Sequence, residues 1–161
     1  MEMNHKKSIG DLALSSVRLA VENVLKGGGP FGAIIVREGE VVAQGANQVT
    51  LSNDPTAHAE VVAIREACKT LDTYQLSDCI LVTSCEPCPM CLGAAYWSRV
   101  SSVYYIATKE DAARAGFDDS FIYKELNLPH AERSIPFIKL DLAEFNAPFE
   151  AWKNNSDKKP Y

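Results

Sequence analysis

Two short motifs constrain this chain more than any other feature: His-Ala-Glu at residues 58–60 and Pro-Cys-Pro-Met-Cys at residues 87–91. Cys88 and Cys91 are three residues apart at the start of a predicted helix, so their side chains share one face of it. A helix N-terminus favours the thiolate form of cysteine, which is the form that binds metals. His58 lies at the start of another predicted helix and supplies a third ligand. The fold therefore has to bring the starts of two helices to one site.

Three protein ligands are the pattern of a catalytic zinc site. Tetrahedral zinc held by His58, Cys88 and Cys91 keeps one position for water, whereas a structural site fills all four positions with protein ligands. Glu60 follows His58 by two residues, which in a regular helix sets the two side chains about 200° apart. They converge only if both lie at the helix end. We expect Glu60 to be a proton shuttle and not a ligand, with one Zn²⁺ per subunit.

Other interpretations of the cysteines stay open at this point. A structural site would take Cys85, the first cysteine of "TSCEPCPMC", as its fourth ligand. A thioredoxin-like redox pair is less favoured, because that motif does not come with an H-x-E partner. Cys85 precedes Pro87 and is expected at a strand end, before the helix that carries Cys88 and Cys91. We interpret Cys85 as a nearby thiol without a bond to zinc.

The charge balance argues against nucleic acid and membrane partners. The chain has 16 Lys and Arg against 21 Asp and Glu, a net charge of −5, so it lacks the basic footprint of a polyanion-binding protein. No apolar run is long enough to span a membrane, and the sequence shows no signal peptide. Five cysteines in such a chain are typical of a reducing, cytoplasmic setting in which they serve metal binding or catalysis.

Strands and helices alternate along the chain, which predicts an α/β fold with a mixed sheet of roughly five strands in one domain over residues 1–161. The first two strands are joined by a turn at residues 37–40 and should pair antiparallel, and the later strands should be parallel. Asp54 is expected to cap the second helix, with Pro55 at its first position, and Pro87 to open the third. The expected helices cover residues 8–25, 55–70, 87–97 and 142–154. The expected strands cover residues 31–36, 41–45, 79–84, 100–108 and 134–142.

The combination H-x-E followed by P-C-x-x-C is the signature of zinc-dependent nucleobase deaminases. The sequence resembles the cytidine deaminase-like superfamily, and more narrowly it is similar to the small bacterial guanine deaminases. The resemblance implies a three-layer α/β/α domain and hydrolytic deamination of guanine to xanthine and ammonia by a zinc-activated water, with Glu60 moving the protons. The stretches that carry it, within residues 28–125, are "GGPFGAIIV", "GAN", "NDPTAHAEVVAIREAC", "TSCEPCPMCLGAAYWSRV" and "AGFDDSFIYKE".

Residues outside the zinc motifs would select the base. Phe31 precedes the first strand, where its ring either stacks on the base or belongs to the core. The resemblance implies that Asn47 hydrogen-bonds the base, because an amide offers both a donor and an acceptor. Guanine presents N–H donors that a carboxylate would face, and Asp119 is preferred over Asp118 for that task, with the reverse order open. The resemblance also implies a homodimer in which the C-terminal segment, with Tyr161, crosses to the partner subunit and helps to close its active site.

Three rival functions share part of this pattern. A tRNA adenosine deaminase has the same zinc motifs, but it would need a basic face for RNA, and this chain is acidic. A cytosine or guanosine deaminase would differ only in its pocket. A structural zinc module that binds a partner would need a fourth ligand and would leave Glu60 without a task. The preferred hypothesis is an enzyme that acts on a small purine base.

Overall fold

One mixed sheet of four strands organises residues 7–161, the part of the chain that this computed structural model describes. Its strands are β1 (Gly32–Arg37), β2 (Glu40–Ala46), β3 (Cys79–Cys85) and β4 (Ser102–Ala107). In the order β2-β1-β3-β4, the strand β1 runs antiparallel to both of its neighbours, and β3 and β4 run parallel. The predictions of a mixed sheet and of an antiparallel first pair are confirmed.

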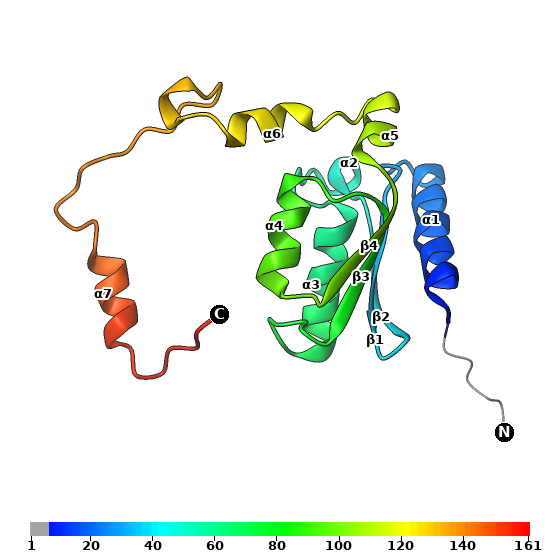
Figure 1. The fold of residues 1–161 in the computed structure, drawn as a ribbon. Coiled ribbons are helices and arrows are strands. Elements are labelled where there is room, and N and C mark those ends of the chain that lie inside the picture. Colours follow the sequence, from blue (N-terminus) through cyan, green and yellow to red (C-terminus); the bar gives the residue numbers. More distant parts are fainter. Residues whose placement is uncertain (1–6) are drawn as a thin grey trace. The chain divides into compact units, whose positions relative to one another are not determined.

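Helices cover both faces of the sheet, which gives the expected three-layer α/β/α arrangement (Figure 1). The first helix, α1, packs on β1 and β3 from one side. On the other side α3 packs on β2 and β1, with α4 next to α3. The helices of this part of the chain are α1 (Ile9–Leu25), α2 (Val49–Ser52), α3 (Ala59–Leu71), α4 (Pro89–Ser98) and α5 (Lys109–Arg114).

Successive residues of β3 serve opposite layers of the core. Leu81 packs with Ala33 and Ala63 in the cluster that lies under α3. Val82, the next residue, packs with Ile34 in the cluster that lies under α1. Because strand side chains alternate between the two faces, a strand buried on both sides needs an unbroken apolar run, which is what the sequence supplies here.

The start of α3 differs from the sequence prediction. The helix begins after His58, which is its N-cap, and not at Pro55 after an Asp54 cap. Asp54 instead accepts hydrogen bonds from the backbone N–H and the hydroxyl of Thr56, at 2.8 and 2.7 Å, and closes a turn before the helix. The prediction that Asp54 is the N-cap is therefore wrong, and the helix starts four residues later than expected.

The start of α4 is shifted in the same way. Its N-cap is Cys88 and its first helical residue is Pro89, whereas the sequence predicts Pro87 at that position. His58 and Cys88 are therefore both N-cap residues, and both have extended backbone conformations. This places two predicted metal ligands at equivalent points of neighbouring helices.

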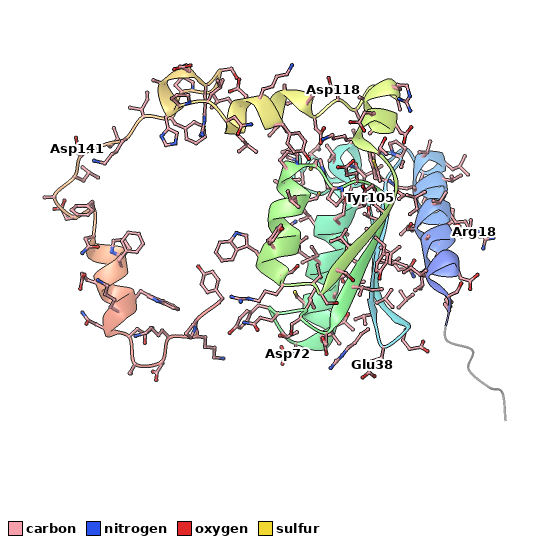
Figure 2. The ribbon with its side chains drawn as sticks, in the orientation of Figure 1. Arg18, Glu38, Asp72, Tyr105, Asp118 and Asp141 are labelled. Carbon is pink, nitrogen blue, oxygen red and sulfur yellow. The ribbon has the colours of Figure 1, made fainter. Side chains whose placement is uncertain are left out.

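The two ends of the sheet carry different structures. At one end lie the β1–β2 turn with Glu38 and the C-terminal end of α3 with Asp72 (Figure 2). At the other end lie the carboxyl ends of β3 and β4, the starts of α3 and α4, and the segment after α5 that leads to Asp118. Ligands of open α/β sheets bind outside the carboxyl ends of the strands, so this second end is where a site is expected.

Residues 120–161 form a second unit, while the described residues 7–119 form the first. The predicted strand at residues 134–142 is not formed, so the sheet of the described residues has four strands and not five. Pro136 removes one backbone donor from that segment, and the segment pairs with no strand. The expectation of one domain stays a prediction.

The second unit holds α6 (Ser120–Leu126), a 3-10 turn (His130–Glu132) and α7 (Ala147–Asn154).

Apolar side chains of the second unit are exposed. None of its residues is buried, and Phe137 and Trp152 are among those that face solvent within the unit. The described part of the chain contains no helix with the length and apolar character that crossing a membrane requires.

Candidate active site

His58, Cys88 and Cys91 bring their ligand atoms together at the starts of α3 and α4. The Nδ1 atom of His58 lies 3.5 Å from each of the two sulfur atoms, and the three ligand atoms are within 4.8 Å of one another. Tetrahedral zinc with ordinary bond lengths separates sulfur and nitrogen ligands by about 3.5 Å. Among residues 7–161 this is the one His, Cys, Asp or Glu group with metal-binding geometry, and it fits zinc.

The protonation of the cluster also suits a cation. A hydrogen bond from Cys91, helped by one from His58, lowers the pKa of Cys88 to about 4. The bond to Cys88 raises the pKa of His58 in turn. Donating to Cys88 also raises the pKa of Cys91, so this thiol keeps its proton beside the thiolate. A divalent cation would replace these protons and leave two thiolates and a neutral imidazole as its ligands.

Glu60 lies beside this cluster in the first turn of α3. It is only 5% exposed, and its Oε2 atom is 3.3 Å from the sulfur of Cys91. Burial raises the pKa of this carboxyl above its ordinary value, as is common for carboxyl groups that act as general acids or bases. The extended N-cap backbone of His58 lets the two side chains reach one site although they are only two residues apart.

Cys85 ends β3 close to the cluster but lies outside it. Its sulfur donates a hydrogen bond to the carbonyl oxygen of Thr108 at 3.6 Å, and burial raises the pKa of this thiol to about 11. Cys85 is not part of the group whose ligand atoms lie within 4.8 Å of one another, so its position excludes it as a ligand. The regular spacing of the three cysteines therefore does not correspond to three equivalent positions in space.

Two aromatic rings meet next to the start of β1. Phe31 is half-buried and packs against the core cluster under α3, and its ring makes an edge-to-face contact with Phe117 at 5.0 Å between centroids. Phe117 is a residue that the sequence reasoning did not single out. Its place in "AGFDDS", two residues before Asp119, was the available signal.

Asn47 is held by a network that begins on α1. It is 7% exposed, and its Oδ1 accepts a hydrogen bond from the N–H of Val49 at 3.2 Å. Asn23 donates from Nδ2 to the carbonyl oxygens of Gly29 and Asn47, both at 2.8 Å. A Cβ atom on Gly28 would lie 2.4 Å from that same Nδ2 atom, so only glycine leaves room for the network.

Sequence reasoning missed Asn23, although a signal for it exists. It follows the buried Ala20 by three residues and therefore falls on the buried face of α1. A buried amide on an apolar face needs hydrogen-bond partners, and here they are the backbone of the loop before β1 and of Asn47.

Of the two aspartates after α5, Asp119 has the stronger link to the cluster. Its side chain is half-buried, whereas Asp118 is exposed. Burial raises the pKa of Asp119, and the negative charge of Cys88 raises it further, which reflects their proximity. Tyr161 belongs to the second unit, where its ring makes an edge-to-face contact with Trp152 at 6.4 Å.

Comparison with known proteins identifies close relatives of this chain. The family model of the cytidine and deoxycytidylate deaminase zinc-binding region matches residues 5–107. Guanine deaminase of Bacillus subtilis is 59% identical over 160 residues, which are 99% of this chain and 100% of that protein. The X-ray structure of that guanine deaminase aligns with a TM-score of 0.95 over 96% of this chain and 99% of its own.

Two further relatives match a smaller part of the chain. The tRNA-specific adenosine deaminase of Aquifex aeolicus is 46% identical over 96 residues, which are 60% of this chain and 62% of that protein. The crystal structure of NE0047 in complex with 2,6-diaminopurine is 38% identical, with a TM-score of 0.66 over 68% of this chain and 61% of that one. The family model, the full-length relative and the geometry of the zinc ligands agree. The chain belongs to the zinc-binding cytidine and deoxycytidylate deaminase family.

Proposed function

We propose that this protein deaminates guanine by hydrolysis, so that guanine and water give xanthine and ammonia. The observation that carries the proposal is the three-ligand cluster of His58, Cys88 and Cys91 with the buried carboxylate of Glu60 beside it. The substrate is inferred from the 59% identity with a guanine deaminase along nearly the whole chain.

The residues present would hold zinc through one imidazole and two thiolates. When bound there, zinc lowers the pKa of a coordinated water from about 15.7 towards about 7 and so supplies the nucleophile. Glu60 takes one proton of the attacking water as the new C–O bond forms at C2 of the base, and passes it to the ring nitrogen. It then takes the proton of the hydroxyl on C2 and passes it to the amine as the C–N bond breaks. Its burial next to Cys91 keeps bulk water away from this proton transfer.

Recognition of the base falls to residues around the cluster. The edge-to-face pair of Phe31 and Phe117 forms an aromatic wall against which a planar base would pack. Asn47 has its Oδ1 occupied by Val49, which leaves its amide N–H₂ group to donate to an acceptor of the base. Asp119 would accept from the N–H donors of guanine, which adenine and cytosine do not present in the same arrangement.

The active unit is inferred to be a cytoplasmic homodimer without nucleic acid or membrane partners. The second unit buries none of its side chains, so its apolar residues have no core of their own. Such a segment gains stability by covering another surface, and the proposed exchange places Tyr161 at the active site of the partner subunit.

Removing Lys158–Tyr161 tests this exchange. Turnover should fall sharply while zinc content stays at one ion per chain, because the zinc ligands all belong to the first unit. Light scattering of the truncated and native proteins would report the oligomeric state alongside the assay. Native turnover after the truncation would rule out a role for Tyr161.

A panel of substrates tests the reaction itself. Zinc-loaded protein is supplied with guanine, guanosine, adenine, cytosine, cytidine or a tRNA anticodon stem-loop, and ammonia release is measured. Guanine should be the best substrate and the stem-loop inert, consistent with the net charge of −5. Activity on the stem-loop or on cytosine, with guanine inert, would overturn the substrate and keep the zinc chemistry.

A further inference from the structure

A buried hydroxyl on β3 touches the carboxylate that the proposed function uses. Thr83 is 0% exposed, and its Oγ1 lies 3.2 Å from Oε1 of Glu60. Two and four residues earlier in the same strand, on the same face, are Leu81 and Cys79, which are also fully buried. On this face of β3, apolar residues therefore precede Thr83, whose hydroxyl is the first polar group at the site.

A hydroxyl at such a position requires an explanation. Valine has almost the same shape as threonine and would fill this place without a polar atom to satisfy. The partners within reach of Thr83 Oγ1 are Oε1 of Glu60 at 3.2 Å and the carbonyl oxygen of Gly32 at 3.5 Å. The hydroxyl has one proton to donate, and an ionised carboxylate is both the closer and the stronger acceptor.

The two oxygens of Glu60 consequently have different surroundings. Oε1 faces the hydroxyl of Thr83, whereas Oε2 faces the zinc-ligand cluster, 3.3 Å from the sulfur of Cys91. In this structure Oε2 accepts from the thiol of Cys91, but as a zinc ligand Cys91 would be a thiolate with no proton to donate, which would leave Oε2 facing the site and Oε1 held by Thr83. The 3.2 Å separation is long for a hydroxyl donor, as is common for catalytic groups before substrate binds.

We propose that Thr83 is a positioning residue, which holds Oε1 of Glu60 so that Oε2 carries the protons between water and base. The inference rests on the proposed function, because it assigns the two oxygens their tasks in that deamination. One proton of the attacking water goes to Oε2 and on to the ring nitrogen, and the proton of the hydroxyl then attached to C2 goes by the same oxygen to the leaving amine. Oε1 keeps the hydrogen bond from Thr83 throughout. Thr83 itself neither gains nor loses a proton.

A matched pair of variants isolates the hydroxyl. Thr83→Ser and Thr83→Ala both lose the methyl group, but only the serine keeps the donor to Glu60. Thr83→Val keeps the shape and removes the donor. Ser98→Ala serves as a control, because it removes a buried hydroxyl that bonds only to the Ala95 carbonyl oxygen of its own helix. For each variant kcat, KM, zinc content and the thermal midpoint are measured.

The expected result is a split between kcat and KM. Thr83→Ala and Thr83→Val should lower kcat by about 10- to 100-fold, a fraction of the typical contribution of positioned proton transfer, with KM within about 3-fold of native. Thr83→Ser should restore kcat to within about 3-fold, and zinc should stay at one ion per chain throughout. Ser98→Ala should leave kcat unchanged.

Several outcomes would overturn the inference without touching the proposed function. Equal kcat in Thr83→Ser and Thr83→Ala would show that the hydroxyl has no task, and this comparison holds even where the valine variant fails to fold. Loss of zinc together with kcat would assign Thr83 to the integrity of the site. The kcat ratio is measured on whichever base of the panel the native protein deaminates, so an inert guanine refutes the substrate alone. Absence of turnover on every base would remove both proposals.

Discussion

The two units of this chain differ in how far their apolar side chains are buried. In the first unit, Leu81 and Ile35 are 0% exposed, and both faces of the sheet fill a core. In the second unit, Ile138 is 78% exposed and Phe145 is 74% exposed, and no side chain is buried. A segment that buries none of its side chains cannot offset, through its own packing, the conformational entropy that it loses on ordering. The first unit is therefore stabilised by its own core, whereas the second has no core within itself.

The chemistry follows the same division. All three zinc ligands and Glu60 belong to the first unit, where packing on both sides of the sheet fixes their positions. Tyr161 is the one proposed site residue from the second unit. Changes at the zinc ligands or at Glu60 should therefore abolish metal binding or catalysis, whereas changes in the second unit should leave the zinc content unchanged.

The largest effect is expected from Cys88→Ala. Loss of this thiolate removes one of three protein ligands, so zinc content and turnover should both fall to background. Cys85→Ala is the matched control, because it removes a buried thiol from the adjacent strand end that bonds to Thr108 instead of the cluster. Metal analysis by mass spectrometry after gel filtration measures both. Loss of zinc in Cys85→Ala would instead point to a four-ligand structural site.

Glu60→Gln is expected to separate metal binding from catalysis. The amide keeps the size of the side chain and leaves the ligands intact, but it cannot take up the proton of the water. Turnover should fall by about 10²- to 10⁴-fold with one zinc still bound per chain. Steady-state ammonia release and metal analysis on the same preparation give both values. A variant with near-native turnover would remove Glu60 from the mechanism.

A pair of apolar truncations compares the two units directly. Leu81→Ala opens a cavity in the core of the first unit and should cost about 2–5 kcal/mol of unfolding free energy. Ile138→Ala removes a similar amount of apolar surface from a position that is exposed in the single chain, and should cost less than about 0.5 kcal/mol in protein diluted until the proposed dimer dissociates. Urea unfolding followed by circular dichroism measures both. A large cost for Ile138→Ala would show that the second unit is covered in solution even at low concentration.

The parts of the structure that sequence predicts well are those decided locally. The four strands of the sheet are apolar runs bounded by turn residues, and the zinc ligands form a motif whose spacing is itself the signal. The start of α3 was misplaced because Asp54 is a favoured N-cap residue and His58 is not, yet Asp54 bonds to Thr56 and the helix begins after His58 without a side-chain cap. The segment 134–142 has the alternation of a strand, but a strand forms only where a partner strand is available.

The contacts that sequence could not predict join residues far apart in the chain. From sequence, Thr83 is one more β-branched residue of a buried strand, and its contact with Glu60 arises only because α3 packs at that position. Asn23 reads as a polar residue near a helix end until Gly29 and Asn47 approach its amide. In each case the residue type is common at such a position, and its role follows from the hydrogen-bond partner that the packing of distant segments brings to it.

The smallest effect is expected from the exposed ion pair of the second unit. Lys139 and Asp141 lie 2.7 Å apart, but their side chains are 87% and 89% exposed, so solvent screens the pair and Asp141→Asn should move the thermal midpoint by less than about 2 °C. Ser8→Ala is the counterpart in the first unit. Ser8 caps α1 by accepting from the N–H of Asp11, and its loss leaves a backbone donor without that partner. We expect a decrease of about 2–4 °C by differential scanning calorimetry, so equal shifts in the two variants would contradict the stated difference between the units.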